Sequence, residues 1–388
     1  MNADLGRKGA LLLVACLTVM SAATVAPALP HMATAFGDAP NAELLSKLVL
    51  TAPAAAIALC APLAGVLVDR FGRVGILRAC LVLYGLAGTA GFVLDDLHAI
   101  LASRVALGVA VAGTMTGMTA LVGDYYAGEV RVRFAGTQSL AMSLGAVACV
   151  GAAGVLADFG WRLPFLLYLT GWVVLVPAML FLDEPRRPTA AHAQAVKGAR
   201  LPLGRITALY AITFFAVAAF YMIPVQVPFL LRAIGVASAA AAGAVVAGAS
   251  LTAAFGSAWF ARLRNTHGVL PIYAWAFALM AAGYALAGLA GTFAGVLAGA
   301  AVAGVGVGLF FPNSNLWVLV LAPPGLRGRL AGGLTSAIFL AQFCSPLLVQ
   351  PVVAATSLGR AFLVAAAGLA LAAAGLALAG ARARTLPA

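Results

Sequence analysis

A run of nine residues, 65–73, places an acid and two arginines between two long apolar stretches. Asp69 is followed directly by Arg70 and, four positions later, by Arg73. A carboxylate at this place can accept hydrogen bonds from free amides at the start of a neighbouring helix, or pair with an arginine. Such a contact can hold two helix bundles together on one face and break when they rock apart. The spacing fits equally well a solvated loop with a tight glycine turn.

The distribution of carboxylates bears on which solute the chain could handle. No Asp or Glu follows Glu184, and none lies in the middle of a long apolar stretch. A cation buried in a membrane protein needs a counter-charge, which is usually a carboxylate. We therefore expect a neutral or anionic solute in preference to a cation.

Few residues could carry a proton. His31 lies near the end of the first apolar stretch, and a histidine can load and release protons near neutral pH. The same residue could simply face the lipid headgroups. Asp38 and Glu43 follow in the next hydrophilic segment, and Asp124 ends the fourth apolar stretch. If none of these residues titrates, the chain has no proton carrier among them.

Arg104 lies a few residues inside an apolar stretch. An arginine in hydrocarbon costs roughly 3 kcal/mol on insertion scales, so it usually faces a cavity or a partner. The alternative is that its side chain snorkels to the headgroups.

These residues have to be positioned by helices that cross a membrane. The 388 residues are 64% hydrophobic and 9% charged, whereas a soluble domain is about half apolar and a quarter charged. Only helices or closed barrels satisfy the backbone in lipid, and the apolar stretches here do not alternate, which favours helices. We predict an all-α integral membrane protein with twelve transmembrane helices. The expected spans are 9–31, 46–68, 74–94, 98–122, 134–156, 162–182, 206–230, 238–260, 269–290, 293–321, 331–354 and 359–380.

The basic residues support this number of helices. An even number places both termini on one side of the membrane, and most of the 23 lysines and arginines then fall on that side. Basic loops stay in the cytoplasm, so both termini are expected there. The net charge of +12 is thus a topology signal, and no binding of nucleic acid is expected. The other side and its helix ends hold Lys47, Arg104, Arg162, Arg232 and Arg360.

The chain divides into two similar halves. The hydrophilic stretch 183–205 is expected to be a cytoplasmic linker between bundles of six helices, 1–182 and 206–388. An Arg-x-Arg pair followed by Ala-Gly occurs at 131–136 and again at 327–332. The segment 256–264 likewise matches 65–73 at its terminal glycine and arginine. These two matches indicate a duplicated six-helix unit and hence two pseudo-symmetric bundles.

The segment 65–73 resembles the loop signature of the major facilitator superfamily, Gly-x-Leu-x-Asp-Arg-x-Gly-Arg, which that family places between its second and third helices. The segment 101–108 resembles the pattern of the fourth helix, with Arg104 as the matching arginine and Leu107 in place of the usual glutamine. Residues 145–165 are similar to drug:proton antiporters, although their Gly-Pro pair is Cys149-Val150 here. The residues that match the loop signature are Gly65, Leu67, Asp69, Arg70, Gly72 and Arg73.

The resemblance implies roles for particular residues. It implies that the signature residues Gly65, Asp69, Arg70, Gly72 and Arg73 form a conformational latch. It also implies that Arg104 faces a central cavity and takes part in proton transfer, with His31, Asp38 and Asp124 as further candidates.

In this family the first, fourth, seventh and tenth helices line the cavity, and prolines bend the seventh and tenth helices here. Each polar residue on these helices could equally make a hydrogen bond between helices worth about 0.6 kcal/mol. The candidates for solute contact are Thr24, Tyr221, Gln226, Asn313, Asn315 and Trp317, together with Gln342 on the eleventh helix.

We therefore expect a secondary active transporter of the bacterial inner membrane that moves a small neutral or anionic amphipathic solute by alternating access. Drug-like efflux coupled to protons is the first hypothesis, and uptake or exchange of an organic anion or neutral metabolite is the alternative. An enzyme is disfavoured, because no Ser/His/Asp set, acidic metal cluster or phosphate-binding Gly-Lys loop occurs. A pore is disfavoured, because duplicated halves and a loop latch favour a rocking motion. We expect no cofactor or metal, a monomer, and the solute, protons and membrane lipid as partners.

Overall fold

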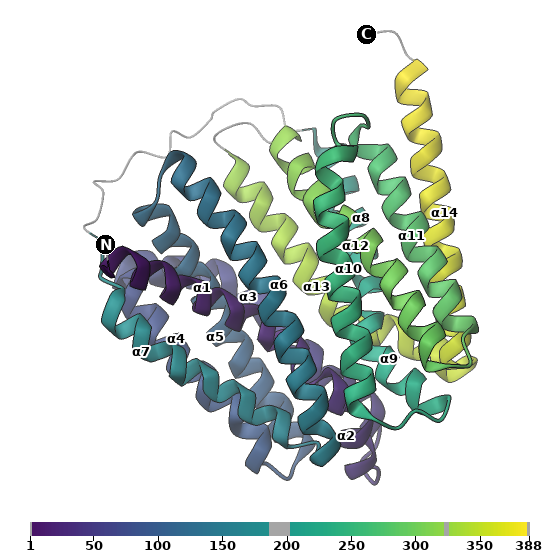
Figure 1. The fold of residues 1–388 in the computed structure, drawn as a ribbon, viewed down its shortest axis with the longest axis horizontal. Helices are drawn as coiled ribbons and strands as arrows, with labels where there is room; N and C mark the ends of the chain where they lie inside the picture. The colour runs from purple at the N-terminus through teal and green to yellow at the C-terminus, as the bar shows by residue number, and fades with distance from the viewer. Residues whose placement is uncertain (1, 186–201, 322–325, 386–388) are drawn as a thin grey trace. The chain divides into compact units, whose positions relative to one another are not determined.

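The computed structural model describes residues 2–185, 202–321 and 326–385. Across these ranges, twelve helical spans are long and apolar enough to cross a membrane, which confirms the predicted number. The chain divides into two compact units, Met1–Ala191 and His192–Ala388, each with six of these spans (Figure 1). Most of the linker expected at 183–205 falls on residues 186–201, which lie outside the described residues.

The N-terminal unit contains two spans that are interrupted by short 3₁₀ turns. Pro27 and Pro164 lie within these turns. A proline has no amide hydrogen to donate, so it disrupts a regular α-helix at these places. The first span therefore consists of α1, η1 and α2, and the sixth of η2 and α7. The elements of this unit are α1 (Asn2–Ala23), η1 (Ala26–Ala28), α2 (Leu29–Ala35), α3 (Ala42–Phe71), α4 (Arg73–Val93), α5 (Leu97–Tyr125), α6 (Gly128–Phe159), η2 (Leu163–Leu169) and α7 (Thr170–Phe181).

The C-terminal unit has one interrupted span, which breaks at Tyr221 between α8 and α9. Pro224 explains this break, because it has no amide hydrogen to offer the carbonyl of Phe220 four residues earlier. The elements of this unit are α8 (Leu203–Phe220), α9 (Met222–Ala233), α10 (Ala239–Leu263), α11 (Val269–Leu289), α12 (Phe293–Leu321), α13 (Arg327–Ala355) and α14 (Leu358–Thr385).

Several helices are longer than the sequence predicts. The 30 residues of α3 extend for about 45 Å, whereas the hydrocarbon core of a bilayer is about 30 Å thick. Similarly, α6 begins at Gly128, so the Arg-x-Arg segment at 131–133 lies within the first turns of this helix instead of in a loop. Hydropathy marks only the part of a helix that lies in lipid, so the polar turns beyond it were missed.

Small residues allow the helices of each unit to pack closely. In the C-terminal unit α12 lies against both α10 and α11. A Cβ atom added at Gly308 would lie 2.1 Å from the carbonyl oxygen of Ala253, and one at Gly306 would lie 2.5 Å from that of Ala276. Glycine is needed at these two positions because the backbones of neighbouring helices approach too closely for a side chain.

Candidate functional site

The signature segment 65–73 contains a single non-helical residue. Helix α3 ends at Phe71 and α4 begins at Arg73, and Gly72 between them has φ 99° and ψ 152°. This backbone conformation is readily adopted only by glycine. The direction in which α4 leaves α3 therefore depends on Gly72.

The first turn of α4 is capped by an acid from far along the chain. The two carboxylate oxygens of Glu184 accept hydrogen bonds from the backbone amides of Arg73 and Val74, each at 2.8 Å. A carboxylate at this position satisfies two free amides and complements the positive end of the helix dipole. A Cβ atom at Gly72 would lie 3.1 Å from this carboxylate, so the turn and the cap fit closely together.

Arg73 also makes an ion pair with its side chain. Its Nε lies 2.8 Å from Oδ2 of Asp124 at the end of α5, and both side chains are mostly buried. The ion pair joins the start of α4 to the end of α5. Asp124, which was predicted as a candidate proton carrier, therefore also stabilises the contact between these two helices.

The residues just before Glu184 contact α1, α4 and α5. The side chain of Arg7 on α1 lies 3.4 Å from the carboxylate of Asp183, and the hydroxyl of Tyr125 donates to the Asp183 carbonyl. Arg78 of α4 donates to the carbonyl of Leu182 at 2.9 Å. We call this set the basal network: Arg7, Arg73, Arg78, Asp124, Tyr125, Asp183 and Glu184.

Asp69 was expected to cap a neighbouring helix or to pair with an arginine, and within the described part of the N-terminal unit it does neither. It is exposed near the end of α3, and its carboxylate makes no hydrogen bond or ion pair with another described residue of the N-terminal unit. The guanidinium of Arg70 lies 5.4 Å from the ring of Phe71, and Gly65 lies within α3 with open space at its Cβ position. The acid that caps α4 is Glu184, whereas the latch role of Asp69 stays a prediction.

Glu184 was not predicted as a site residue, because its hydrophilic surroundings are typical of a linker. A signal was available, since Asp183 and Glu184 follow the sixth apolar stretch directly. The sixth helix ends on the same side of the membrane as the signature segment. Acids at that point can therefore reach the amides at the start of α4.

Arg104 is fully enclosed in the N-terminal unit. Its side chain is 1% exposed, which excludes the alternative that it snorkels to the headgroups. Its Nη2 donates to the carbonyl oxygens of Ala87 at 2.7 Å and Gly88 at 2.5 Å, both on α4. The guanidinium also lies 4.9 Å from the ring of Phe165 and 5.0 Å from that of Tyr168. Carbonyl oxygens and aromatic faces thus surround this cation.

Tyr168 links Arg104 to the first span. Its side chain contacts Thr24 as well as Arg104, and its hydroxyl donates to the carbonyl of Ser21 at 3.3 Å. Thr24 is buried, and its hydroxyl donates to the carbonyl of Met20 at 2.5 Å. Arg104 and Thr24, which were predicted for separate roles, therefore belong to one buried polar cluster.

The opposite end of α3 carries a buried charge that the sequence analysis did not single out. The side chain of Lys47 is 0% exposed, and its Nζ lies 2.5 Å from the half-exposed carboxylate of Glu43. The hydroxyl of Thr51, one turn further along, is buried without a hydrogen-bond partner. His31 on α2 also has a buried, unpartnered Nδ1, whereas Asp38 is exposed.

Three side-chain amides in the C-terminal unit retain unused hydrogen-bonding capacity. Gln226 on α9 is 1% exposed, and neither atom of its amide group has a partner. The buried Oε1 of Gln342 on α13 has no partner either. Asn313 on α12 donates to the carbonyl of Val269 at 3.0 Å but leaves its Oδ1 unpaired. Buried polar groups are normally paired, so these atoms are available for a solute or for water.

The other three residues of this unit that were predicted to contact the solute differ in burial. Tyr221 is buried at the break between α8 and α9, and Asn315 is exposed. Trp317 is partly buried and packs on Tyr273, with ring centroids 5.6 Å apart. Among the residues that the structure describes, no three His, Cys, Asp or Glu side chains are grouped as a metal site.

Proteins of known function match parts of the chain. It is 32% identical over 126 residues to the bacillibactin exporter of Bacillus subtilis (strain 168), covering 31% of each protein. It is 30% identical over 159 residues to multidrug resistance protein 1 of the same organism, covering 40% of each. The aligned regions thus span well under half of these relatives.

A solved structure matches nearly the whole fold. A bacterial homologue of the human lysosomal transporter Spinster, in an inward-facing and occupied conformation, superimposes with a TM-score of 0.79 at 19% identity, over 98% of this chain and 96% of that chain. The profile of the Major Facilitator Superfamily matches residues 11–225, which is more than half of the sequence. The chain belongs to the Major Facilitator Superfamily and is a multi-pass membrane transporter, as the signature segment and the twelve spans predicted.

Proposed function

We propose that the chain exports a small neutral or anionic amphipathic solute across the bacterial inner membrane, with both termini in the cytoplasm and with protons as the coupling ion. The observation that carries this proposal is the sign of the buried charges. Arg104 and Lys47 are buried cations, and the C-terminal unit contains no Asp or Glu. A cationic solute would lack a counter-charge in that unit, whereas a neutral or anionic solute would not need one.

The C-terminal amides supply the second part of the proposal. The side-chain oxygens of Gln226, Asn313 and Gln342 and the amide nitrogen of Gln226 lack partners in the structure, so these residues offer neutral acceptors and a neutral donor. An amide can bind a carbonyl, hydroxyl or carboxylate of a solute, and it does so without a charge. Amphipathic compounds with such groups therefore fit this unit. The bacillibactin exporter among the relatives supports export as the direction of transport.

Proton coupling is supported by the buried polar clusters of the N-terminal unit. His31 has a buried, unpartnered ring nitrogen, and a histidine can change its charge near neutral pH. An arginine keeps its proton in proteins, so Arg104 does not carry the coupling proton. It makes the cluster that also contains Thr24 and Tyr168 positively charged. Asp38 is exposed, which favours His31 over Asp38 as the carrier.

The experiment that tests this function is transport into proteoliposomes with an imposed pH gradient. Chloramphenicol, salicylate and ethidium serve as neutral, anionic and cationic probes, and vesicles without protein give the background. We expect flux of a neutral or anionic probe that follows the pH gradient. Flux of ethidium alone would contradict the inferred solute class, and flux without dependence on the gradient would indicate a uniporter or exchanger.

A further inference from the structure

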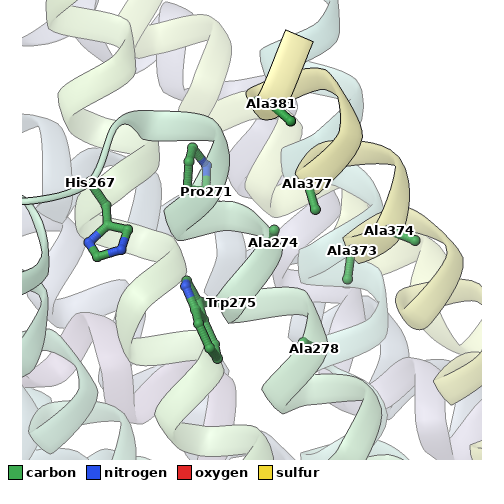
Figure 2. Close-up of a pocket in the computed structure, with 10 residues that line it drawn as sticks. His267, Pro271, Ala274, Trp275, Ala278, Ala373, Ala374, Ala377 and Ala381 are labelled. Atoms are coloured by element: carbon green, nitrogen blue, oxygen red, sulfur yellow. The ribbon is translucent and has the colours of Figure 1, made fainter. Parts of the chain in front are cut away.

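An open groove runs along α11 and α14 of the C-terminal unit. It has a volume of about 470 Å³, and His267, Pro271 and Trp275 line it on one side. Alanines of α14 line the opposite side, among them Ala374 and Ala377 (Figure 2). None of the candidate solute residues lines this groove.

The groove continues along the same pair of helices. A second hollow of about 520 Å³ extends toward Ala285 and Leu363, and Ala278 and Ala373 line both hollows. The two helices are close together at that end, since a Cβ atom at Gly288 would lie 2.7 Å from the carbonyl oxygen of Gly359. The result is a long, shallow apolar channel within the length of both spans.

The channel is open on its outer side. Trp275 of α11 is 55% exposed, and Leu371 and Leu378 of α14 are also exposed. Helices α11 and α14 are two of the twelve membrane spans, so exposed apolar side chains at this depth meet lipid. A flexible acyl chain has the shape and the polarity that such a channel can accept.

The end of the groove at His267 is basic. Arg262 lies in the last turn of α10 and Arg264 follows this helix, so both come within five residues of His267 along the chain. The Nδ1 of His267 lies 2.7 Å from the hydroxyl oxygen of Thr266. Because no Asp or Glu occurs after Glu184, no side chain of this unit repels an anion there. This end of the channel is therefore complementary to a phosphate group.

We propose that the groove between α11 and α14 binds one anionic phospholipid, with an acyl chain along the alanines and the phosphate at the His267 end. The surrounding bilayer is as apolar as the alanines, so burial of the chain alone gives no preference for one lipid over another. The shape of the channel holds the acyl chain, and the basic segment selects the headgroup. The site is separate from solute transport and does not depend on the proposed function.

The test measures lipid binding to the purified full-length chain by native mass spectrometry. The probes are dioleoyl phosphatidylglycerol and dioleoyl phosphatidylcholine, which share acyl chains and differ in headgroup charge. One basic residue near an anionic lipid strengthens binding by about fivefold, so at least this preference for phosphatidylglycerol is expected. The triple variant Arg262→Gln, Arg264→Gln and His267→Gln should bind both lipids equally.

A second set of variants fills the groove. Ala374→Leu combined with Ala377→Leu should reduce binding of both lipids, because the larger side chains occupy the channel. Ala379→Leu is the matched control, since Ala379 is exposed on the same helix but does not line the groove. If the filled variant does not fold, the triple variant, which changes residues outside the packed core, still tests the headgroup preference.

Three results would overturn the proposal. The first is equal binding of the two lipids by the unchanged protein, and the second is an equal loss of binding in the groove variant and in Ala379→Leu. The third is a dimer of the unchanged protein that the groove variant converts to monomers without losing lipid, because the groove would then accommodate a second copy of the chain.

Discussion

The two units of this transporter manage their polar groups in opposite ways. The N-terminal unit holds every Asp and Glu of the chain and uses several of them in the basal network and in the Lys47–Glu43 pair. The C-terminal unit has no acid, so none of its arginines can pair with a carboxylate side chain of the same unit. Its buried polar groups include neutral amides with unused hydrogen-bonding capacity.

This difference indicates a division of tasks. Charged contacts with good geometry fix helix ends, and the basal network does this for α1, α4, α5 and α7. Neutral amides can change partners without leaving a charge unpaired, which suits repeated binding and release of a solute. We expect the N-terminal unit to govern coupling and conformational change, and the C-terminal unit to govern solute affinity.

The largest effect is expected for Arg104. Arg104→Gln removes the buried cation together with its two hydrogen bonds to α4, so flux driven by the pH gradient should fall to the background of vesicles without protein. Solute affinity, which we assign to the other unit, should change little. Arg162→Gln is the control, because Arg162 pairs with the exposed Asp95. Wild-type flux in the Arg104 variant would remove this residue from the mechanism.

Gln226 tests the assignment of affinity to the C-terminal unit. Loss of one or two hydrogen bonds to the solute in Gln226→Leu should weaken binding about tenfold, as measured by equilibrium binding to the purified protein. Removal of an unpaired buried amide should also leave the melting temperature unchanged or raised. Asn313→Leu breaks an existing bond to α11 and should lower it, which separates the two kinds of amide. Unchanged affinity in the Gln226 variant would break the proposed division of tasks.

Asp69 tests whether the N-terminal unit governs conformational change. Asp69→Asn should slow transport by about fivefold, the effect of losing a charge–dipole contact of about 1 kcal/mol. Binding of the solute should persist, and stability should hold because Asp69 is exposed. Parallel flux and binding assays make this measurement. A loss of binding in a folded variant would count against the latch.

The smallest effect is expected for the helix cap. Glu184→Gln keeps one acceptor for the amides of α4 but loses the charge, so unfolding should become easier by about 1 kcal/mol. Thermal unfolding in detergent measures this change. Asp183→Asn is the matched control, since the Asp183 side chain is 83% exposed and its ion pair with Arg7 should contribute little. Equal effects of the two variants would show that the cap contributes no more than a surface pair.

Much of the architecture could be predicted from the sequence because it depends on local properties. Apolar stretches of sufficient length gave the twelve spans, and the sequence Asp-Arg-Phe-Gly-Arg pointed to the family and to the tight turn at Gly72. The breaks at Pro27 and Tyr221 also follow from local chemistry, since each lies at or near a proline. The helical state of the Arg131 segment was missed, because polar turns outside the lipid carry no hydropathy signal.

The sequence alone thus determined the number of spans, their division into two halves and the absence of acids from the second half. Only the tertiary structure decided which groups meet: Glu184 with the amides of α4, Arg104 with the carbonyls of α4 and two rings, and the buried Lys47 with Glu43. The physical reason is that membrane insertion depends on the composition of each segment, whereas hydrogen bonds and ion pairs depend on which helix ends and faces become neighbours.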